Sequence, residues 1–132
     1  MRYAEGDRLN PAEYRRLRAA AGWSDPALDD ATLGGVLAAT WNVTARADDG
    51  PLVGMGRLQD DGLYASIWDM IVLPEHRGHG IGSEILERML ARCRGRSLVA
   101  LVATPFGAPM YRAAGFSEES RGSIALFRRD VR

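Results

Sequence analysis

The sequence predicts an α/β fold with a mixed central β-sheet, and three observations support this prediction. Residues 41–58 carry apolar side chains that alternate with polar ones around a turn, which is typical of an antiparallel hairpin. Residues 63–103 read as strand, helix and strand, the order of a right-handed crossover unit with a parallel strand pair. A chain of 132 residues has the length of one domain, so we expect residues 1–132 to form a single domain.

Two helices are expected before the hairpin. Asn10 is a favourable helix cap, Pro11 suits the first turn, and Glu13 follows three residues after the cap. Residues 24–26 read SDP and repeat this start signal. The apolar positions after them continue at helical spacing as far as residue 37.

The sheet is expected to begin with antiparallel strands. Residues 41–45 alternate between apolar and polar side chains, as in a half-buried strand. The turn residues at 48–51 separate them from a returning strand at 52–58. A second turn at 60–62 then leads into a long strand at 63–73.

The second half of the chain is expected to continue with a helix and a parallel strand. Residues 81–93 repeat apolar side chains at helical spacing, and Gly95 follows as a stop signal. Residues 98–103 form an unbroken apolar run, which favours a central parallel strand covered on both faces. A short helix at 109–114 and a last strand at about 124–128 complete the predicted order.

Composition narrows the function classes. The formal net charge is zero and there is no long basic run, which argues against nucleic acid as the main partner. The single cysteine, Cys93, cannot form an internal disulfide. No stretch of about 18 apolar residues suggests a membrane span, and the first ten residues do not resemble a signal peptide. We therefore expect a cytoplasmic protein with no membrane partner.

Three glycines alternate in the turn between the long strand and the following helix, where residues 77–82 read RGHGIG. Glycine lets a ligand approach the main chain closely, and the first N–H groups of a helix form an anion site. A P-loop needs a lysine that this chain lacks, and a dinucleotide-binding fold needs an acid at the end of the next strand. The pattern therefore indicates a phosphate-binding turn of another kind.

This segment resembles the coenzyme A motif of the GCN5-related N-acetyltransferase (GNAT) family. Arg77, Gly80 and Gly82 match the family core Gln/Arg-x-x-Gly-x-Gly/Ala, and the preceding Val-x-Pro-Glu matches as well. Residues 110–116 read MYRAAGF and are similar to the second motif of the family, a Tyr followed shortly by Gly-Phe. The two motifs and the segment that connects them cover roughly residues 63–117.

The resemblance implies the acyl-CoA N-acyltransferase fold, in which the two parallel strands splay apart and hold the pantetheine arm of coenzyme A. Met70, Ile71 and Val72 would bond to this arm through their backbone, and one amide, at Ile71 by position, would polarise the thioester carbonyl. Arg77 would add charge or set the turn. Main-chain N–H groups of six residues are expected to hold the pyrophosphate: Gly78, His79, Gly80, Ile81, Gly82 and Ser83.

The implied reaction moves an acetyl group from acetyl-CoA to a primary amine by direct attack on the thioester. Tyr111 matches the tyrosine that serves as the acid for the leaving thiolate. Asp69 is the candidate base or amine ligand, although the acid of the family most often sits where this chain has Trp68. Strand alternation would place these two side chains on opposite faces unless a bulge intervenes. A chain of water molecules could remove the proton instead.

Several alternatives stay open at this stage. An enzyme that acetylates a small-molecule amine is the favoured interpretation, a non-catalytic acyl-CoA-binding or sensing module is the second, and protein N-terminal or lysine acetylation is the third. No metal is expected, because the two histidines lack a cysteine or acid cluster. A homodimer is possible by analogy with the family. Three tryptophans could line the acceptor pocket or pack in the core: Trp23, Trp41 and Trp68.

Overall fold

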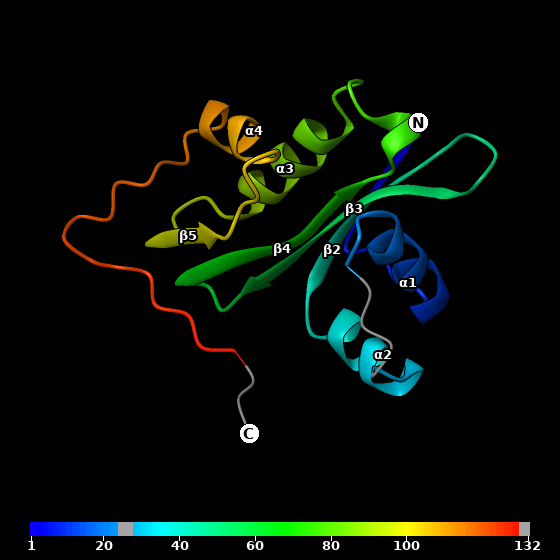
Figure 1. Cartoon of the computed structure of the whole chain (residues 1–132), viewed down its shortest axis with the longest axis horizontal. Coiled ribbons are helices and arrows are strands. Elements are labelled where there is room, and N and C mark those ends of the chain that lie inside the picture. The colour runs from blue at the N-terminus through cyan, green and yellow to red at the C-terminus, as the bar shows by residue number, and fades with distance from the viewer. Residues whose placement is uncertain (24–27, 130–132) are drawn as a thin grey trace. The chain divides into compact units, whose positions relative to one another are not determined.

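A five-stranded mixed sheet with the order β1-β2-β3-β4-β5 organises the first of two compact units of the chain (Figure 1). The computed structural model describes residues 1–23 and 28–129. The first unit is Met1–Val102, and the second is Ala103–Arg132. The mixed sheet with helices confirms the predicted α/β class.

Four strands pair antiparallel in chain order, and the fifth runs parallel to the fourth. The predicted hairpin and the predicted parallel pair are therefore confirmed. The first strand, a short edge segment, had no signal in the sequence. The bounds of the strands are β1 (Arg2–Glu5), β2 (Trp41–Arg46), β3 (Leu52–Asp60), β4 (Tyr64–Val72) and β5 (Leu98–Leu101).

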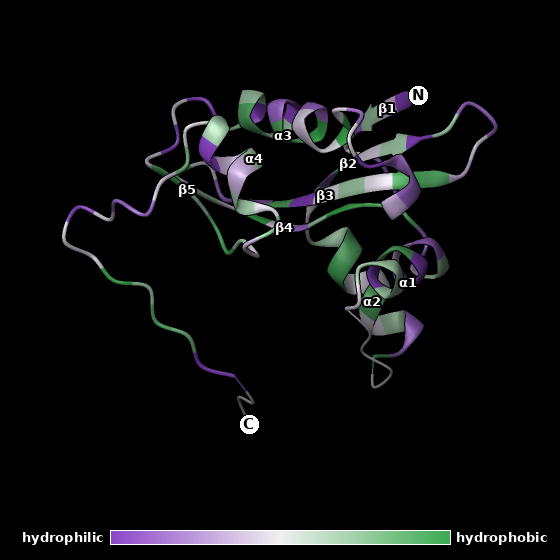
Figure 2. Ribbon diagram, turned by 45° about the horizontal axis from the view of Figure 1, so that its top comes forward, coloured by the Kyte–Doolittle hydropathy of each residue, from purple (hydrophilic) through white to green (hydrophobic). Residues whose placement is uncertain are grey.

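Helices cover both faces of this sheet. Figure 2 shows α1 (Pro11–Ala20) and α2 (Asp30–Ala38) on one face and α3 (Ile81–Arg92) on the other. Asn10 caps α1 as predicted, since its side chain accepts a hydrogen bond from the Glu13 N–H at 2.8 Å. The start signal predicted at 24–26 lies outside the described residues. No helix among residues 1–23 and 28–129 is long and apolar enough to cross a membrane.

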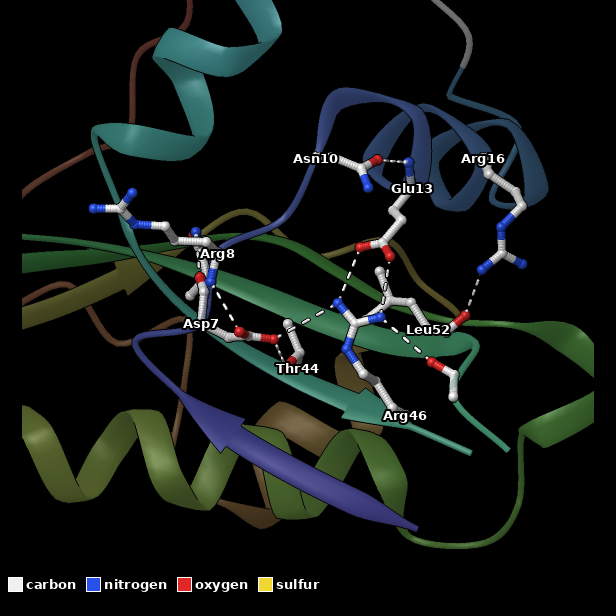
Figure 3. A network of polar contacts seen from close by, with 10 residues as sticks. Asp7, Arg8, Asn10, Glu13, Arg16, Thr44, Arg46 and Leu52 are labelled. Atoms are coloured by element: carbon white, nitrogen blue, oxygen red, sulfur yellow. Dashed lines mark hydrogen bonds and ion pairs between the residues drawn. The ribbon is translucent and has the colours of Figure 1, made fainter. Parts of the chain in front are cut away.

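A polar network anchors the start of α1 to the sheet (Figure 3). Arg46 on β2 donates to both carboxylate oxygens of Glu13, at 3.1 and 3.0 Å. Arg16 donates to the Leu52 carbonyl oxygen at 2.8 Å. Because these contacts tie α1 to two strands, the side chains on the inner face of α1 are held at fixed places above the sheet.

Two glycines of β3 let α3 pack close to the other face. A Cβ atom at Gly54 would lie 3.1 Å from the side chain of Ile81. One at Gly56 would lie only 2.4 Å from the sulfur of Met70 and 2.8 Å from that of Met89. Side chains of the neighbouring helix and strand therefore fill the space beside these two glycines, which gives the dense packing of a protein interior.

Two expectations about the end of the chain are wrong. The strand predicted at 98–103 is shorter than expected, and it ends the sheet instead of occupying its centre, with Leu98 55% exposed. Residues 124–128 form no strand, and Leu126 is 83% exposed. An unbroken apolar run reports the lack of polar side chains but not how many strands lie beside it. Residues 124–128 would form a strand only beside a partner edge, and no described residue pairs with them.

A carboxylate–guanidinium pair links the end of β3 to the segment just before β5. Arg96, just before β5, donates to the two carboxylate oxygens of Asp60 at 2.7 and 2.8 Å. Asp60 ends β3, and its side chain is 8% exposed. The Arg96 guanidinium beside Asp60 lowers the pKa of that carboxyl to about 2. The pair therefore fixes the connection between α3 and β5 onto the end of β3.

Replacing Asp60 by Asn should lower the free energy of unfolding at neutral pH by roughly 1.5–3 kcal/mol, because charge-assisted bonds are lost. The folded-state pKa of Asp60 lies below its unfolded value, so this stabilisation is complete above about pH 4 and is lost as the pH falls toward about 2. Urea unfolding over this range measures the effect. The gap between wild type and D60N should close on acidification, and a constant gap would contradict the assignment.

Candidate active site

β4 extends beyond its parallel neighbour, which leaves one edge of β4 open. β5 pairs with β4 only as far as Ile67, which lies opposite Leu101, whereas β4 continues to Val72. Among the described residues, no strand pairs with 68–72 on that side. Backbone N–H and C=O groups alternate in direction along a strand, so some of these groups face the open side. An extended ligand can bond to such an edge as an added strand would.

A β-bulge interrupts β4 where the open edge begins. In the register between β3 and β4, the single residue Gly56 lies opposite two residues, Asp69 and Met70. Asp69 has a φ of 52°, in the left-handed region that residues other than glycine rarely adopt. Trp68 lies opposite Arg57, whose side chain binds Asp69, so Trp68 and Asp69 lie on one face. β4 therefore contains the bulge that the sequence analysis named as the condition for these two side chains to share a face.

The carboxylate of Asp69 lies among three donors. One oxygen accepts from Arg18 at 2.9 Å, and the other accepts from the Nε of Arg57 at 2.8 Å and from the Tyr14 hydroxyl. The Asp69 side chain is 11% exposed. Burial, and after it the hydrogen bond to Asp69, raises the pKa of Tyr14. Asp69 is thus tied both to α1 and to β3, on the face that α1 covers.

None of these three partners was foreseen from the sequence. Tyr14 and Arg18 are one helical turn apart, so they point to the same side of α1. Arg57 is a charged residue that follows the apolar first half of β3, and its side chain is only 12% exposed. A nearly buried charge needs a partner, and this was the one signal that could have led to Asp69.

The turn between β4 and α3 exposes main-chain N–H groups. Gly78 and Gly80 have φ values of 81° and 78°, and a Cβ atom at either position would meet nothing within 4 Å. Gly80 occupies the N-cap position of α3. It has no side chain that could bond to the first N–H groups of the helix, those of Ile81, Gly82 and Ser83. Open space, uncapped N–H groups and the positive end of the helix dipole together form an anion site.

Side chains around this turn hold it in place. The Nε of Arg77 donates to the Val72 carbonyl oxygen at 3.1 Å, which ties the turn to the end of β4. His79 is exposed. Glu84 in the first turn of α3 pairs with Arg88 at 2.9 Å, so its negative charge is compensated near the anion site. Within the described part of the chain, no group of three or more His, Cys, Asp or Glu could hold a metal ion.

Tyr111 lies in the second unit, on α4 (Ala108–Ala113), which confirms the predicted short helix. The Tyr111 ring meets the Phe116 ring edge-on, with 6.0 Å between the ring centres. Its side chain is 9% exposed, and burial raises the pKa of Tyr111 to about 12. The phenol therefore stays protonated throughout the neutral range.

The three tryptophans lie in different surroundings. The guanidinium carbon of Arg92 lies over the Trp41 ring, 4.5 Å from the ring centre. Trp68 is 43% exposed, and its indole N–H donates to the Ser66 hydroxyl at 2.8 Å. Trp23 follows α1 and bonds through its backbone N–H. Trp68 is thus the tryptophan that lies on β4 immediately beside the bulge.

A family model described as an acetyltransferase (GNAT) domain matches residues 40–118. The chain is 37% identical over 81 residues to GCN5-related N-acetyltransferase 3, chloroplastic, from Arabidopsis thaliana, a match that covers 59% of this chain and 34% of that protein. It is 35% identical over 77 residues to serotonin N-acetyltransferase 2, chloroplastic, from Oryza sativa subsp. japonica, covering 56% and 38%. The chain thus spans less than half the length of these two relatives.

Among solved structures, an acetyltransferase of the GNAT family from Streptococcus pneumoniae is similar to the chain with a TM-score of 0.78 and 23% identity. The alignment covers 98% of both chains. At this identity the likeness concerns the fold, and it extends beyond the segment that the family model matches.

Replacing Gly80 by Val should weaken the binding of coenzyme A by about tenfold or more. A β-branched residue is disfavoured at a φ of 78°, so the N–H groups of the turn would shift. Calorimetry with coenzyme A measures the change. Gly62→Val is the matched control, because Gly62 also has a positive φ and open space but lies in the β3–β4 turn. Equal affinity of the two variants would contradict the site.

Proposed function

The chain belongs to the GNAT acetyltransferase family, and on this basis we propose that it transfers the acetyl group of acetyl-CoA to a primary amine of a small molecule. One observation carries the proposal. The open edge of β4 runs directly into the glycine turn at the start of α3. An edge that binds an extended amide chain, followed by an anion site, suits the pantetheine arm and the pyrophosphate of coenzyme A in that order.

The proposed donor site consists mainly of backbone groups. Met70, Ile71 and Val72 would bond to the amides of the pantetheine arm, and an N–H group near Ile71 would polarise the thioester carbonyl. The N–H groups from Gly78 to Ser83 would hold the pyrophosphate. The uncapped start of α3 and the space beside Gly78 and Gly80 support this assignment.

In the proposed reaction, the amine nitrogen attacks the thioester carbon, a C–N bond forms and the C–S bond breaks. The amine loses one proton, and the leaving thiolate gains one. Tyr111 is the proposed donor to the thiolate. Because the pKa of Tyr111 is about 12 and that of an ordinary thiol is about 8.5, complete proton transfer from the phenol is uphill. Tyr111 is therefore proposed to stabilise the developing thiolate by a hydrogen bond, and the proton that the thiolate gains comes from water.

The proton that the amine loses needs an acceptor. Asp69, the base predicted from the sequence, already accepts hydrogen bonds from Arg18, Arg57 and Tyr14. Each of these donors stabilises the ionised form of the carboxylate and therefore makes it a weaker base. Transfer to water is compatible with the occupied carboxylate.

A non-catalytic acyl-CoA-binding module is the second candidate, because Trp68 stands where the family most often has an acid. A protein acceptor is the third. The relatives include a serotonin N-acetyltransferase, whose named substrate is a small amine, and a solved structure from Brucella melitensis named as a ribosomal-protein-alanine N-acetyltransferase. We favour the small amine.

The remaining proposals concern location and partners. A cytoplasmic location and independence from nucleic acid and membranes are proposed from the sequence, and a homodimeric state is proposed by analogy with the family. The net charge of zero supports the absence of a nucleic-acid partner. Two of the relatives are named as chloroplastic proteins, so fractionation in the source cell is the appropriate test of location.

Calorimetry should show that the protein binds both acetyl-CoA and coenzyme A, and thiol release across a panel of primary amines should show turnover. The absence of binding at millimolar ligand would overturn the proposed donor. Binding without turnover on any amine would favour the acyl-CoA-binding module.

Tyr111→Phe should lower kcat by about 10²-fold while the affinity for coenzyme A stays within about threefold of wild type, because only the hydroxyl group is removed. Steady-state kinetics and calorimetry on the same preparation measure the two quantities. Unchanged kcat would remove Tyr111 from the mechanism.

The raised pKa of Tyr111 also predicts that kcat does not fall between about pH 8 and about pH 10 through loss of the phenol proton, because the group titrates near 12. A pH–rate profile of the wild-type protein tests this. A descending limb in that range that disappears in Tyr111→Phe would show that the phenol ionises there.

A further inference from the structure

We infer that Asp69 is a positioning residue, whose carboxylate holds the left-handed bulge of β4 and, through it, the backbone edge that would receive the thioester. This inference rests on the proposed function and assigns Asp69 a role other than that of the base. It concerns one residue that three independent features single out: its backbone conformation, its partners and the packing of its neighbour.

The backbone at Asp69 is in an unfavourable conformation. A φ of 52° occurs here inside a nine-residue strand, in a residue that carries a side chain. Such a conformation persists only where the surroundings fix it. Asp and Asn enter the left-handed region more readily than other residues with a side chain, but still far less readily than glycine.

The side chain of Asp69 supplies the contacts that fix this conformation. Arg18 and Tyr14 approach from α1, and Arg57 approaches from β3, so both carboxylate oxygens are occupied. The two ion pairs, at 2.9 and 2.8 Å, are largely shielded from water because the Asp69 side chain is 11% exposed. An exposed pair would contribute little, whereas a shielded and hydrogen-bonded pair is costly to break.

The second bulge residue is fixed from the opposite face. The sulfur of Met70 occupies the space where a side chain at residue 56 would begin, only 2.4 Å from where its Cβ atom would stand. Gly56 is the residue that faces the bulge across the strand pair. Asp69 is thus held by ion pairs on the α1 face of the sheet. On the α3 face, the side chain of Met70 packs into the space that Gly56 leaves free.

This arrangement explains how Asp69 can affect the reaction by positioning backbone groups without acting as a base. The bulge lies immediately before Ile71 and Val72, whose backbone groups would bind the pantetheine arm and polarise the carbonyl. Displacing such donors by about 1 Å can cost about 10²-fold in rate. A base would instead need a carboxylate oxygen directed at the amine, and both oxygens of Asp69 already serve Arg18, Arg57 and Tyr14.

Three substitutions at Asp69 separate the two roles. Asparagine enters the left-handed region more readily than most residues and keeps a side-chain oxygen for the three donors, glycine enters it without penalty but offers no contacts, and alanine has neither property. A positioning role predicts that D69N keeps a kcat at least about tenfold above that of D69A and that D69G lies between them, with the pH–rate profile unchanged in shape. A catalytic base predicts equal loss in all three variants together with loss of the low-pH limb, and this result would overturn the inference.

Matched controls address folding. Asp60→Asn also removes a shielded carboxylate–arginine pair, but at the far end of β3, and should leave kcat within about twofold of wild type. Calorimetry with coenzyme A should show weaker binding for D69A than for wild type, because the displaced groups of Ile71 and Val72 would also bind the pantetheine arm, whereas D69N should stay within about threefold of wild type. A catalytic base would instead lower kcat in D69A and leave the binding of coenzyme A unchanged.

A second readout does not depend on turnover. In two-dimensional NMR spectra, the backbone amide signals of Ile71 and Val72 should move further from their wild-type positions in D69A than in D69N. Unchanged signals in D69A would overturn the positioning role. Wild-type protein that binds no acetyl-CoA would overturn the proposed function instead, and the NMR comparison would still decide the role of Asp69.

Discussion

The bulge at Asp69 and Met70 is the constraint on which the rest of the candidate site depends. A bulge bends its strand and increases the local twist. β4 stops pairing with β5 after Ile67, two residues before the bulge, and from there its edge is open. The bulge and the end of the parallel ladder therefore fall at nearly the same place, where the pantetheine arm is proposed to bind.

The two halves of the proposed donor site are linked through the packing of β3. Gly56 makes room for Met70 of the bulge and for Met89 of α3, while Gly54 makes room for Ile81 at the start of that helix. Absent side chains on one strand therefore seat both the open edge and the helix whose first N–H groups form the anion site. On the other face, α1 brings Tyr14 and Arg18 to Asp69.

Local signals in the sequence predicted much of this structure. The Asn10 cap, the glycine turn and the apolar stripe of α3 depend on residues close together in the chain, and all three were predicted. The partners of Asp69 were not, because Tyr14 and Arg18 lie more than 50 residues away and only the fold brings them near. The bulge could be named only as an alternative, since strand alternation fits both a regular and a bulged β4. The place of β5 and the state of residues 124–128 depend on neighbouring strands, which a local pattern does not contain.

Coenzyme A is proposed to bind along the open edge of β4, with its pyrophosphate at the N-terminus of α3. A crystal structure of the complex with coenzyme A is the decisive measurement. We expect the pantetheine arm to be hydrogen-bonded to the backbone of residues 70–72 and the pyrophosphate to lie against the N–H groups of residues 78–83, with the bulge at Asp69 retained. Coenzyme A bound elsewhere on the chain, or a β4 edge that stays unbonded in the complex, would contradict it.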